Sequence, residues 1–467
     1  MSDKNLGPVI MEREAYLSKC LNEHLLCPRT YVRLTKEEAL EKLRKTRCNL
    51  NQVRLHHRTA LTEAENLYFQ RAAKLPYRIP QFYLTIKVHK TPTKTRPIVS
   101  CVNSYLNVFS KWLSHRFKEL LSFVPTYIKD SFQILDELKT LMLPPQAKLF
   151  TCDAVSMYTN IDSVHGLEVI SSWFEDYPTE ISPDFPKELF LKTLYTVMNE
   201  NVFQLDDTFW QQTFGTSMGT SCACAYATLY WGYIERKYIL PKWQQNLLYL
   251  KRFIDDKFGI WLGTPDEFTN FIADINSYCQ LSWETTGLGK TTTFLDLTIS
   301  ITQNNNIHIK TFQKPTNLHL YIPPNSAHPP GVLKSIIYGN IRRYWLQNTD
   351  ITDFITVTQQ FANRLLARGY NKQKIAHLFA EAAKRLDGII TTNRCTENTL
   401  YLHWTWHPRD IKKSTLRAVF NGTLREKCGF NNLIIAYNRP KSLRDCLMKT
   451  QLIQPEGSRV SSLLPPL

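Results

Sequence analysis

Three aspartates stand where apolar segments end, and their spacing suits the binding of metal ions. Residues 249–261 read YLKRFIDDKFGIW, two apolar arms joined at Asp255 and Asp256, a pattern typical of a β-hairpin. Upstream, residues 148–158 read KLFTCDAVSMY, a short apolar strand that ends near Asp153. Adjacent carboxylates repel each other unless a cation lies between them. Carboxylate oxygens from two strand ends can hold two Mg²⁺ ions for an in-line attack on a phosphate, so the pattern predicts a two-metal site.

Each carboxylate also has a plain structural interpretation. Asp153 alone could be the N-cap of a helix that follows the strand, and Asp255 with Asp256 could form a solvated turn. The combination favours the metal site, because both acidic positions follow strands rich in aromatic and branched residues.

A glycine-containing segment lies between the aspartates in the chain. In residues 211–231, Gly215 and Gly219 stand among hydroxyl residues before a run of small residues with helical potential. Glycine lets a backbone come close to a ligand, here a base or a sugar, where a Cβ would clash. The alternative is a tightly packed helix start, and both interpretations can hold together. The many Gly, Ser, Thr and Gln residues exclude a membrane span.

A basic segment precedes all of these residues. Residues 81–100 predict two strands joined by a turn that contains proline. The cations clustered on this hairpin are Lys87, Lys90, Lys94 and Arg96. Cations over a carboxylate–metal site suit a nucleoside triphosphate, since arginine can bind phosphate oxygens in a bidentate way. Without the aspartates, a solvated basic hairpin would be the favoured interpretation.

In this order the segments resemble a reverse transcriptase, most of all the enzymes of Penelope-like retroelements, which are relatives of the telomerase catalytic subunit. The resemblance covers roughly residues 75–450. The stretches that carry it are KVHKTP (87–92), RPIV (96–99), DAVSMYTNI (153–161), GTSMG (215–219), RFIDD (252–256) and FLDL (294–297). Later stretches that also resemble the family are QKPT (313–316), SAHPP (326–330) and AYNRPKSLRD (436–445).

The resemblance implies a fold and a set of residue roles. The fold would be an α+β right-hand polymerase, with fingers, a palm of antiparallel sheet and flanking helices, and a helical thumb. The metal ligands would be Asp153, Asp255 and Asp256, binding two Mg²⁺ ions that Mn²⁺ could replace. The incoming nucleotide would contact Lys87, Arg96, Ala154, Tyr158, Gly215, Met218 and Gly219. Nucleic acid would contact Lys90, Lys94, Phe294 and Leu295, the last two as part of a primer grip.

Tyr158 has the most specific implied role. It follows Asp153 by five positions and stands where the family places the side chain that excludes a ribose 2′-OH. Two residues depart from the pattern: Phe253 stands where many reverse transcriptases have Tyr, and Met218 where telomerase-like enzymes carry Gln. We expect these departures to affect fidelity rather than to abolish activity.

The implied activity is that of a retroelement RNA-directed DNA polymerase, which extends a primer 3′-OH with dNTPs on an RNA template. Its partners would be the RNA template, a DNA primer or target and dNTPs. Its location would be intracellular, and nuclear in a eukaryotic host. Two alternatives stay open. One is a domesticated, catalytically silent copy that only binds RNA, against which the intact aspartates argue. The other is a two-metal nuclease, in which the basic hairpin and Tyr158 would have no role.

Many members of that family carry a GIY-YIG nuclease after the polymerase. Nothing between Gly429 and Leu467 resembles one, so we expect an endonuclease-deficient or truncated copy. Residues 454–467 are rich in Ser and Pro and are expected to be disordered.

Composition agrees with a nucleic-acid partner. The 467 residues carry a net charge of +16, and neutralising phosphates with such charge releases counterions and drives binding. The eleven cysteines include no CxxC pair, as expected of a reducing, intracellular environment. The polar N-terminus does not resemble a signal peptide. Four residues could bind zinc, but their irregular spacing favours ordinary structural roles; they are Cys395, His403, His407 and Cys428.

Five segments follow from these patterns. They are a helical N-terminal extension at 1–75, fingers at 76–145, a palm at 146–315, a helical thumb at 316–395 and a C-terminal extension at 396–467. Apolar periodicity predicts helices at 265–278, 332–346, 353–368 and 372–386. Gly369 and Asn371 would be the C-cap and N-cap between the last two helices, and a strand is expected around Trp404.

Overall fold

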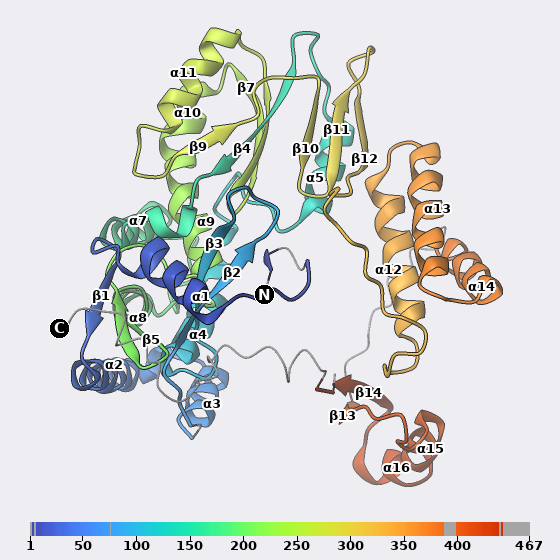
Figure 1. The fold of residues 1–467 in the computed structure, drawn as a ribbon, viewed down its shortest axis with the longest axis horizontal. Helices are drawn as coiled ribbons and strands as arrows, with labels where there is room; N and C mark the ends of the chain where they lie inside the picture. The colour runs from blue at the N-terminus through green and yellow to red at the C-terminus, as the bar shows by residue number, and fades with distance from the viewer. Residues whose placement is uncertain (1, 4–5, 75, 387–397, 439, 442–467) are drawn as a thin grey trace. The chain divides into compact units, whose positions relative to one another are not determined.

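The computed structural model describes residues 2–3, 6–74, 76–386, 398–438 and 440–441. The chain divides into two compact units, and the division falls between Ile307 and His308. Figure 1 shows the helices and strands with the labels used below. All of the predicted catalytic residues belong to the first unit.

A five-stranded sheet in the first unit combines three distant parts of the chain. Its strand order is β1-β6-β5-β2-β3, and only the β5–β2 contact is parallel. The strands are β1 (Tyr31–Leu34), β2 (Gln81–Lys87), β3 (Lys94–Ser100), β5 (Asn201–Leu205) and β6 (Thr208–Gln212). The predicted hairpin at 81–100 is confirmed as β2–β3. The β5–β6 hairpin falls in the predicted palm segment, yet it pairs with a strand of the predicted fingers segment.

The N-terminal segment is mostly helical, as expected, with β1 as the exception. Its helices are α1 (Arg13–Cys20), α2 (Lys36–His56) and α3 (Glu63–Ala72). Capping boxes start α2 at Thr35 and α3 at Thr62, where each threonine accepts a hydrogen bond from the N–H three residues later. β1 has four residues, too few for its alternation to stand out from the helical sequence around it.

A four-stranded sheet carries the predicted metal site. Its order is β7-β8-β4-β9, with all pairs antiparallel. The strands are β4 (Lys148–Ala154), β7 (Leu247–Phe253), β8 (Asp256–Trp261) and β9 (Trp283–Thr285). The hairpin predicted for 249–261 is confirmed as β7–β8. Helix α11 (Pro265–Ile275) lies along this sheet (Figure 1), and the Phe268 ring packs 5.1 Å from the Phe150 ring of β4.

A large aromatic core fixes the helices of the first unit against the four-stranded sheet. The helices are α4 (Tyr105–Leu121), α5 (Ser131–Thr140), α6 (Met157–Asn160), α7 (Ser163–Asp176), α8 (Lys187–Asn199), α9 (Ala223–Ile234) and α10 (Leu240–Trp243). A short π-helical segment, Glu235–Ile239, continues α9. Buried rings from four helices meet in this core: Trp112, Phe117, Trp173, Phe190, Tyr226 and Trp231.

A further hairpin follows, made by β10 (Thr291–Phe294) and β11 (Leu297–Ile301). Strand β12 (Ile307–Thr311) begins where the first unit ends.

The second unit contains the predicted helical bundle. Helices α12 (Val332–Gln347), α13 (Ile351–Ala367) and α14 (Lys372–Ala383) confirm the predicted helices within a few residues. Asn371 is the N-cap of α14, and Gly369 adopts φ +92° after α13 ends. The buried residues at the centre of the bundle include Ile341, Phe361, Leu365 and Ile375.

The rest of the second unit pairs β13 (Thr399–Thr405) in parallel with β14 (Asn432–Asn438) and adds α15 (Lys413–Val419) and α16 (Arg425–Cys428). The strand expected around Trp404 is confirmed. The disorder expected for residues 454–467 concerns residues outside those that the structure describes.

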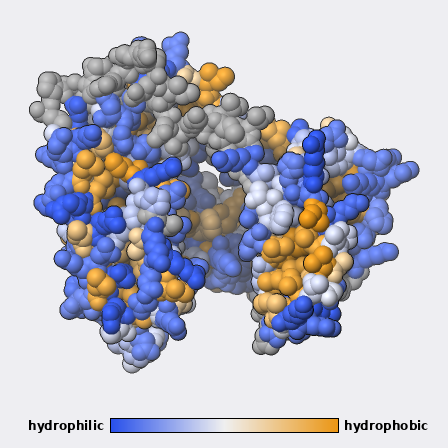
Figure 2. Space-filling model, turned by 90° about the horizontal axis from the view of Figure 1, so that it is seen from below, coloured by the Kyte–Doolittle hydropathy of each residue, from blue (hydrophilic) through white to orange (hydrophobic). Residues whose placement is uncertain are grey.

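The surface is mixed in character. Figure 2 shows a face that is mainly hydrophilic, with hydrophobic side chains gathered in patches. Within the described part of the chain, no helix combines the length and the apolar character needed to cross a membrane.

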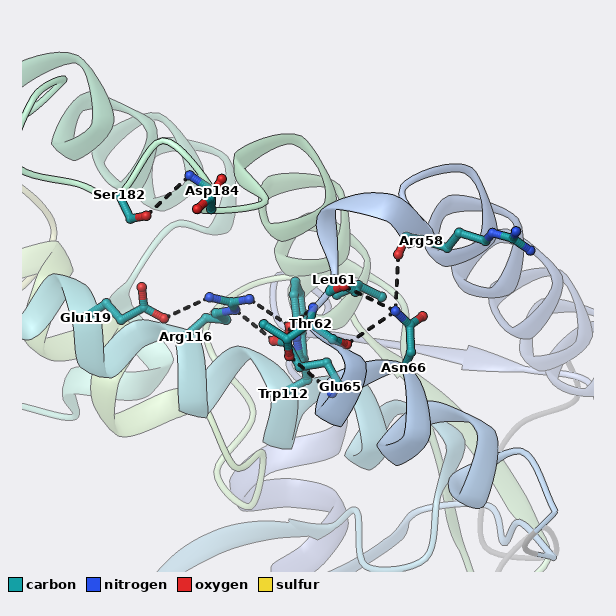
Figure 3. A network of polar contacts seen from close by, with 10 residues as sticks. All are labelled: Arg58, Leu61, Thr62, Glu65, Asn66, Trp112, Arg116, Glu119, Ser182 and Asp184. Carbon is teal, nitrogen blue, oxygen red and sulfur yellow. Dashed lines mark hydrogen bonds and ion pairs between the residues drawn. The ribbon is translucent and has the colours of Figure 1, made fainter.

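One polar network joins α3 to α4 through the buried Glu65 (Figure 3). The Arg116 guanidinium donates to both Glu65 carboxylate oxygens at 2.8 and 2.7 Å, and the Trp112 indole donates at 2.6 Å. The pKa of Glu65 is below its ordinary value: burial would raise it, but Arg116, the Thr62 N–H and Trp112 outweigh burial. The network therefore stabilises the ionised carboxylate.

We expect Glu65→Gln to lower the free energy of unfolding by roughly 2–4 kcal/mol, because the amide removes the buried charge that Arg116 contacts with two hydrogen bonds and leaves Arg116 only the more exposed Glu119. Since the pKa of Glu65 is lowered in the folded state, its contribution is present above the unfolded pKa and is lost as the pH falls through the folded pKa. Denaturant unfolding at several pH values measures both effects. Glu63→Gln, in the same helical turn but exposed, is the control; an equal loss in both variants would contradict the role of the network.

Candidate active site

The structure brings Asp153, Asp255 and Asp256 to one edge of the four-stranded sheet. Asp153 on β4 and Asp256 on β8 lie directly opposite each other in the strand register. Such neighbours point to the same face, with Cβ atoms about 5 Å apart. Asp255 lies in the turn between β7 and β8, and its carbonyl accepts a hydrogen bond from the Ala154 N–H at 2.9 Å. The end of β4 is thereby fastened to the turn.

The charges around Asp255 oppose one another. Its pKa is raised, first by desolvation and then by the negative charge of Asp153, while a backbone hydrogen bond and the charges of Arg96 and Arg252 act in the opposite direction. Two carboxylates close enough to disfavour each other's ionisation are a place where a cation binds favourably. Arg96, from the distant β3, belongs to the same electrostatic neighbourhood.

The donor chemistry of this edge fits Mg²⁺ with help from a substrate. Among the described residues, no group of three or more His, Cys, Asp or Glu side chains could hold a metal ion by itself. Mg²⁺ in nucleotide sites is usually bound by one or two carboxylates, with water and substrate phosphates completing the octahedron. Asp153 and Asp255 would be those carboxylates, with Asp256 beside them. Mg²⁺ binding remains a prediction.

Glu284 is a neighbour that the sequence did not reveal. It lies directly opposite Asp153 on the other side of β4, on strand β9, and is exposed. Asp153 is therefore flanked by Asp256 on one neighbouring strand and Glu284 on the other. No motif surrounds Glu284 in the sequence, and only the pairing of β9 with β4 places it there.

The basic hairpin presents its cations on one face. Lys87 lies opposite Lys94, and Arg96 lies opposite Thr85, so the three cations share a face of β2–β3, while Lys90 lies in the turn. The Arg96 guanidinium donates to Asp3 at 3.2 Å. Asp3 is buried and was not anticipated as a partner. A phosphate that binds Arg96 through the same atoms would compete with Asp3.

Tyr158 is influenced by charges of both the aspartate turn and the basic hairpin. Burial, the neighbouring Cys224 and the charge of Asp255 raise the pKa of Tyr158, and Arg96 opposes them. Its hydroxyl is 3.2 Å from the Cys224 sulfur, and its carbonyl accepts a hydrogen bond from the Thr216 N–H at 2.5 Å. The residue predicted to select the sugar therefore borders the predicted metal ligands and phosphate-binding residues. Its role in selection stays a prediction.

Gly215 and Gly219 are required by contacts within the protein. Gly215 has φ +80°, and a Cβ there would lie 2.9 Å from the Thr159 backbone. Gly219 has φ +124°, and a Cβ would lie 2.1 Å from the carbonyl oxygen of Val99. The neighbouring Met218 carbonyl accepts a hydrogen bond from the Val99 N–H at 2.8 Å. The approach of a nucleotide to these glycines stays a prediction. Independently of any nucleotide, glycine at both positions lets this loop pack closely against β3 and α6.

Phe294 is placed differently from the expectation that it contacts nucleic acid. Its side chain is buried, and its ring packs 5.6 Å from the Phe258 ring of β8. Leu295, next to it, lies at the turn of the β10–β11 hairpin with φ +53° and is partly exposed. The contact of Phe294 and Leu295 with nucleic acid stays a prediction, and the structure adds that the Phe294 ring packs inside the protein.

A buried charge cluster lies behind the aspartate turn. Glu235, Arg252 and Lys257 are at most 1% exposed. Glu235 accepts from Arg252 at 3.0 Å, lies 3.4 Å from the Lys257 ammonium and accepts from the Thr126 hydroxyl at 2.5 Å. Burial lowers the pKa of Lys257 to about 8, although Glu235 opposes that shift.

The same cluster reaches the turn itself. Arg252 donates to the Ile254 carbonyl at 2.9 Å and to the Thr228 carbonyl at 2.8 Å. Ile254, next to Asp255, has φ +54°, a conformation that a β-branched residue rarely adopts. Arg252 therefore fixes a strained turn from behind. The signal in the sequence was the presence of two cations, Arg252 and Lys257, inside apolar strands.

Comparisons with known proteins concern the fold. No protein-family model matches the sequence, and no curated protein matches it. Telomerase from Candida albicans, solved with a TWJ fragment of telomeric RNA, matches with a TM-score of 0.51 at 10% identity, over 80% of this chain and 63% of that chain. Apo telomerase from Candida tropicalis gives a TM-score of 0.43 at 11% identity, over 79% of this chain and 62% of that one. The RNA-dependent RNA polymerase of a human picobirnavirus gives 0.42 at 11% identity, over 66% and 60%.

The chain thus spans less than two thirds of the length of these structures. At 10% identity, the match to the first telomerase concerns the fold alone. The fold class is the α+β right-hand polymerase, as the sequence resemblance implied.

The glycine contacts give a test of the loop. We expect Gly219→Ala to lower the free energy of unfolding by roughly 2–4 kcal/mol, because the new Cβ overlaps the Val99 carbonyl in a strained conformation. Gly287→Ala is the matched control, since Gly287 also has a positive φ but no atom lies within 4 Å of its Cβ position. It should cost about 1 kcal/mol. Urea unfolding of both variants measures the difference, and equal losses would contradict the close contact with β3.

Proposed function

We propose that this protein is an RNA-directed DNA polymerase of a Penelope-like retroelement. The observation that carries the proposal is the meeting of four side chains from distant segments. Three observations support this meeting. Asp153 faces Asp256 in the strand register, and the Asp255 carbonyl is hydrogen-bonded to the Ala154 N–H. The pKa values of Asp255 and Tyr158 both respond to the charge of Arg96. Carboxylates for metal ions, a cation for phosphate and a ring for the sugar are what nucleotide addition needs side by side.

The proposed division of work follows from the chemistry of each side chain. Asp153 and Asp255 would hold Mg²⁺, which neutralises the charge that develops on the phosphate during transfer. Arg96, with Lys87 on the same face of the hairpin, would bind the triphosphate of a dNTP and orient it. Tyr158 would form the floor beneath the sugar. The buried Arg252 would keep the Asp255 turn in place without touching the substrate.

The RNA template and the DNA primer in this proposal rest on the sequence resemblance. The fold match to telomerase and the net charge of +16 support the binding of nucleic acid in this proposal. The retroelement origin rests on the sequence stretches alone.

Primer extension tests the proposal most directly. Purified protein with Mg²⁺, dNTPs and a DNA primer annealed to RNA should extend the primer, and Asp255→Asn should lower the rate by about 10³-fold or more, because it removes a charged metal ligand. Binding of the template–primer duplex should be unchanged. Asp266→Asn, an exposed aspartate at the start of α11, is the control.

Three results would decide against parts of the proposal. An Asp255→Asn protein that extends primers at the wild-type rate would remove the metal assignment. A wild-type protein that binds RNA but never extends a primer would favour the catalytically silent alternative. Extension with ribonucleotides alone would replace DNA synthesis with RNA synthesis.

Sugar selection tests Tyr158. We expect Tyr158→Val to keep DNA synthesis while the ratio of kcat/KM for dNTP over NTP falls by about tenfold or more, since the smaller side chain makes room for a 2′-OH. Cys224→Ala removes the partner of the Tyr158 hydroxyl and leaves the ring, so it should keep the wild-type ratio. The same ratio in Tyr158→Val and wild type would make Tyr158 an ordinary packing residue.

A further inference from the structure

A cavity of about 260 Å³ lies in the first unit and contains none of the residues described above as catalytic. Helix α2 contributes Arg44 and Arg47 to its wall, the segment before β2 contributes Tyr77 and Arg78, and the start of α4 contributes Tyr105. Its volume is slightly below the range of about 300–1,000 Å³ that is usual for ligand pockets, so it suits a single nucleotide rather than a duplex.

The two tyrosine rings form a fixed wall. They meet edge to face with centroids 4.8 Å apart. The Tyr105 hydroxyl donates to Asn51 at 2.5 Å, and the Tyr77 hydroxyl donates to the Ala72 carbonyl. Because both hydroxyls are already bonded to the protein, the rings offer a ligand their faces and edges. Such surfaces stack with any base.

The cations of the cavity are not neutralised to the same degree. Arg44 is paired with Glu41, with N–O distances of 2.8 and 2.9 Å. The Arg47 guanidinium lies 5.3 and 5.5 Å from the centroids of Tyr77 and Tyr105. Within the described part of the chain, Arg47 and Arg78 form no ion pair, and both are exposed. Two guanidinium groups beside aromatic rings are suited to a phosphate and its base.

We propose that this cavity binds one nucleotide of a single-stranded RNA segment, outside the template–primer duplex. The base would stack on the tyrosine wall, and the adjacent phosphates would contact Arg47 and Arg78. Binding would show little sequence preference, since the contacts are a ring and charges. Only the contrast with a template–primer duplex rests on the proposed function; the binding of single-stranded RNA in this cavity does not. A free nucleotide offers the same chemistry, so the test separates the two sources.

The experiment measures RNA binding by fluorescence anisotropy with the full chain. The probes are a labelled oligouridylate, a DNA–RNA duplex without overhang, and unlabelled UMP as competitor. The variant is Arg47→Gln with Arg78→Gln, and the control is Lys118→Gln with Lys129→Gln, which removes the same charge from exposed positions elsewhere in the unit. Tyr77→Leu removes one ring of the wall.

We expect the double arginine variant to lose about tenfold or more in affinity for the oligouridylate and Tyr77→Leu about tenfold, while duplex binding stays constant. The control should lose little for either probe. An equal loss in control and variant would overturn the site in favour of general charge attraction. Displacement of the oligouridylate by UMP at similar concentrations would overturn the proposal that the ligand is an RNA segment, in favour of a free nucleotide.

Unfolding midpoints matched to wild type would show that the variants are folded. Arg47→Gln with Arg78→Lys, which keeps a cation at position 78, should regain part of the affinity that the double arginine variant loses.

Failure of this inference is distinct from failure of the proposed function. A protein without primer extension that still loses oligouridylate binding on Arg47→Gln with Arg78→Gln keeps the cavity and loses the polymerase. If the wild-type protein extends primers and the double arginine variant binds the oligouridylate unchanged, the polymerase function is kept and the cavity site is lost.

Discussion

The position of the aspartate turn depends on the buried carboxylate of Glu235. This group has lost its water, and it is balanced by Arg252 and Lys257, which come from the two strands of the same hairpin. Buried charges of this kind are costly unless every partner is present. Because Glu235 directly follows α9, the hairpin is tied to the helical core, and the guanidinium that binds Glu235 also holds the turn beside Asp255. The geometry of the predicted metal ligands is therefore set by an interaction that never reaches the substrate.

The parts of the structure that sequence patterns predicted are those encoded by local periodicity. The β7–β8 and β2–β3 hairpins, the bundle of α12, α13 and α14, and the N-cap at Asn371 all follow from neighbouring residues. The meeting of Asp153 with the Asp255 turn was also predicted, because two strands of one small sheet that both end in aspartate bring these carboxylates close together when they are neighbours.

The parts that were missed depend on pairing between distant segments. β1 pairs with β6, and β5 pairs with β2, so a piece of the predicted palm segment completes a sheet with the predicted fingers segment. Glu284 and Asp3 lie at the site through the same kind of long-range contact, and no local sequence pattern predicts their positions. Gly219 was singled out correctly, but the atom it approaches belongs to Val99, more than a hundred positions away.

The five-stranded sheet also limits the order in which the protein can form during synthesis. Its hairpin β2–β3 can form early in synthesis. However, β2 can pair with its other neighbour only after β5 has been translated, and β1, which is translated first, can pair only after β6. Until then, the nascent chain presents unpaired strand edges with apolar side chains, the state in which chains associate with one another. Pairings across such sequence separations also close slowly. A chain whose synthesis ends before β5 would therefore be prone to aggregation, even though its β2–β3 hairpin is complete.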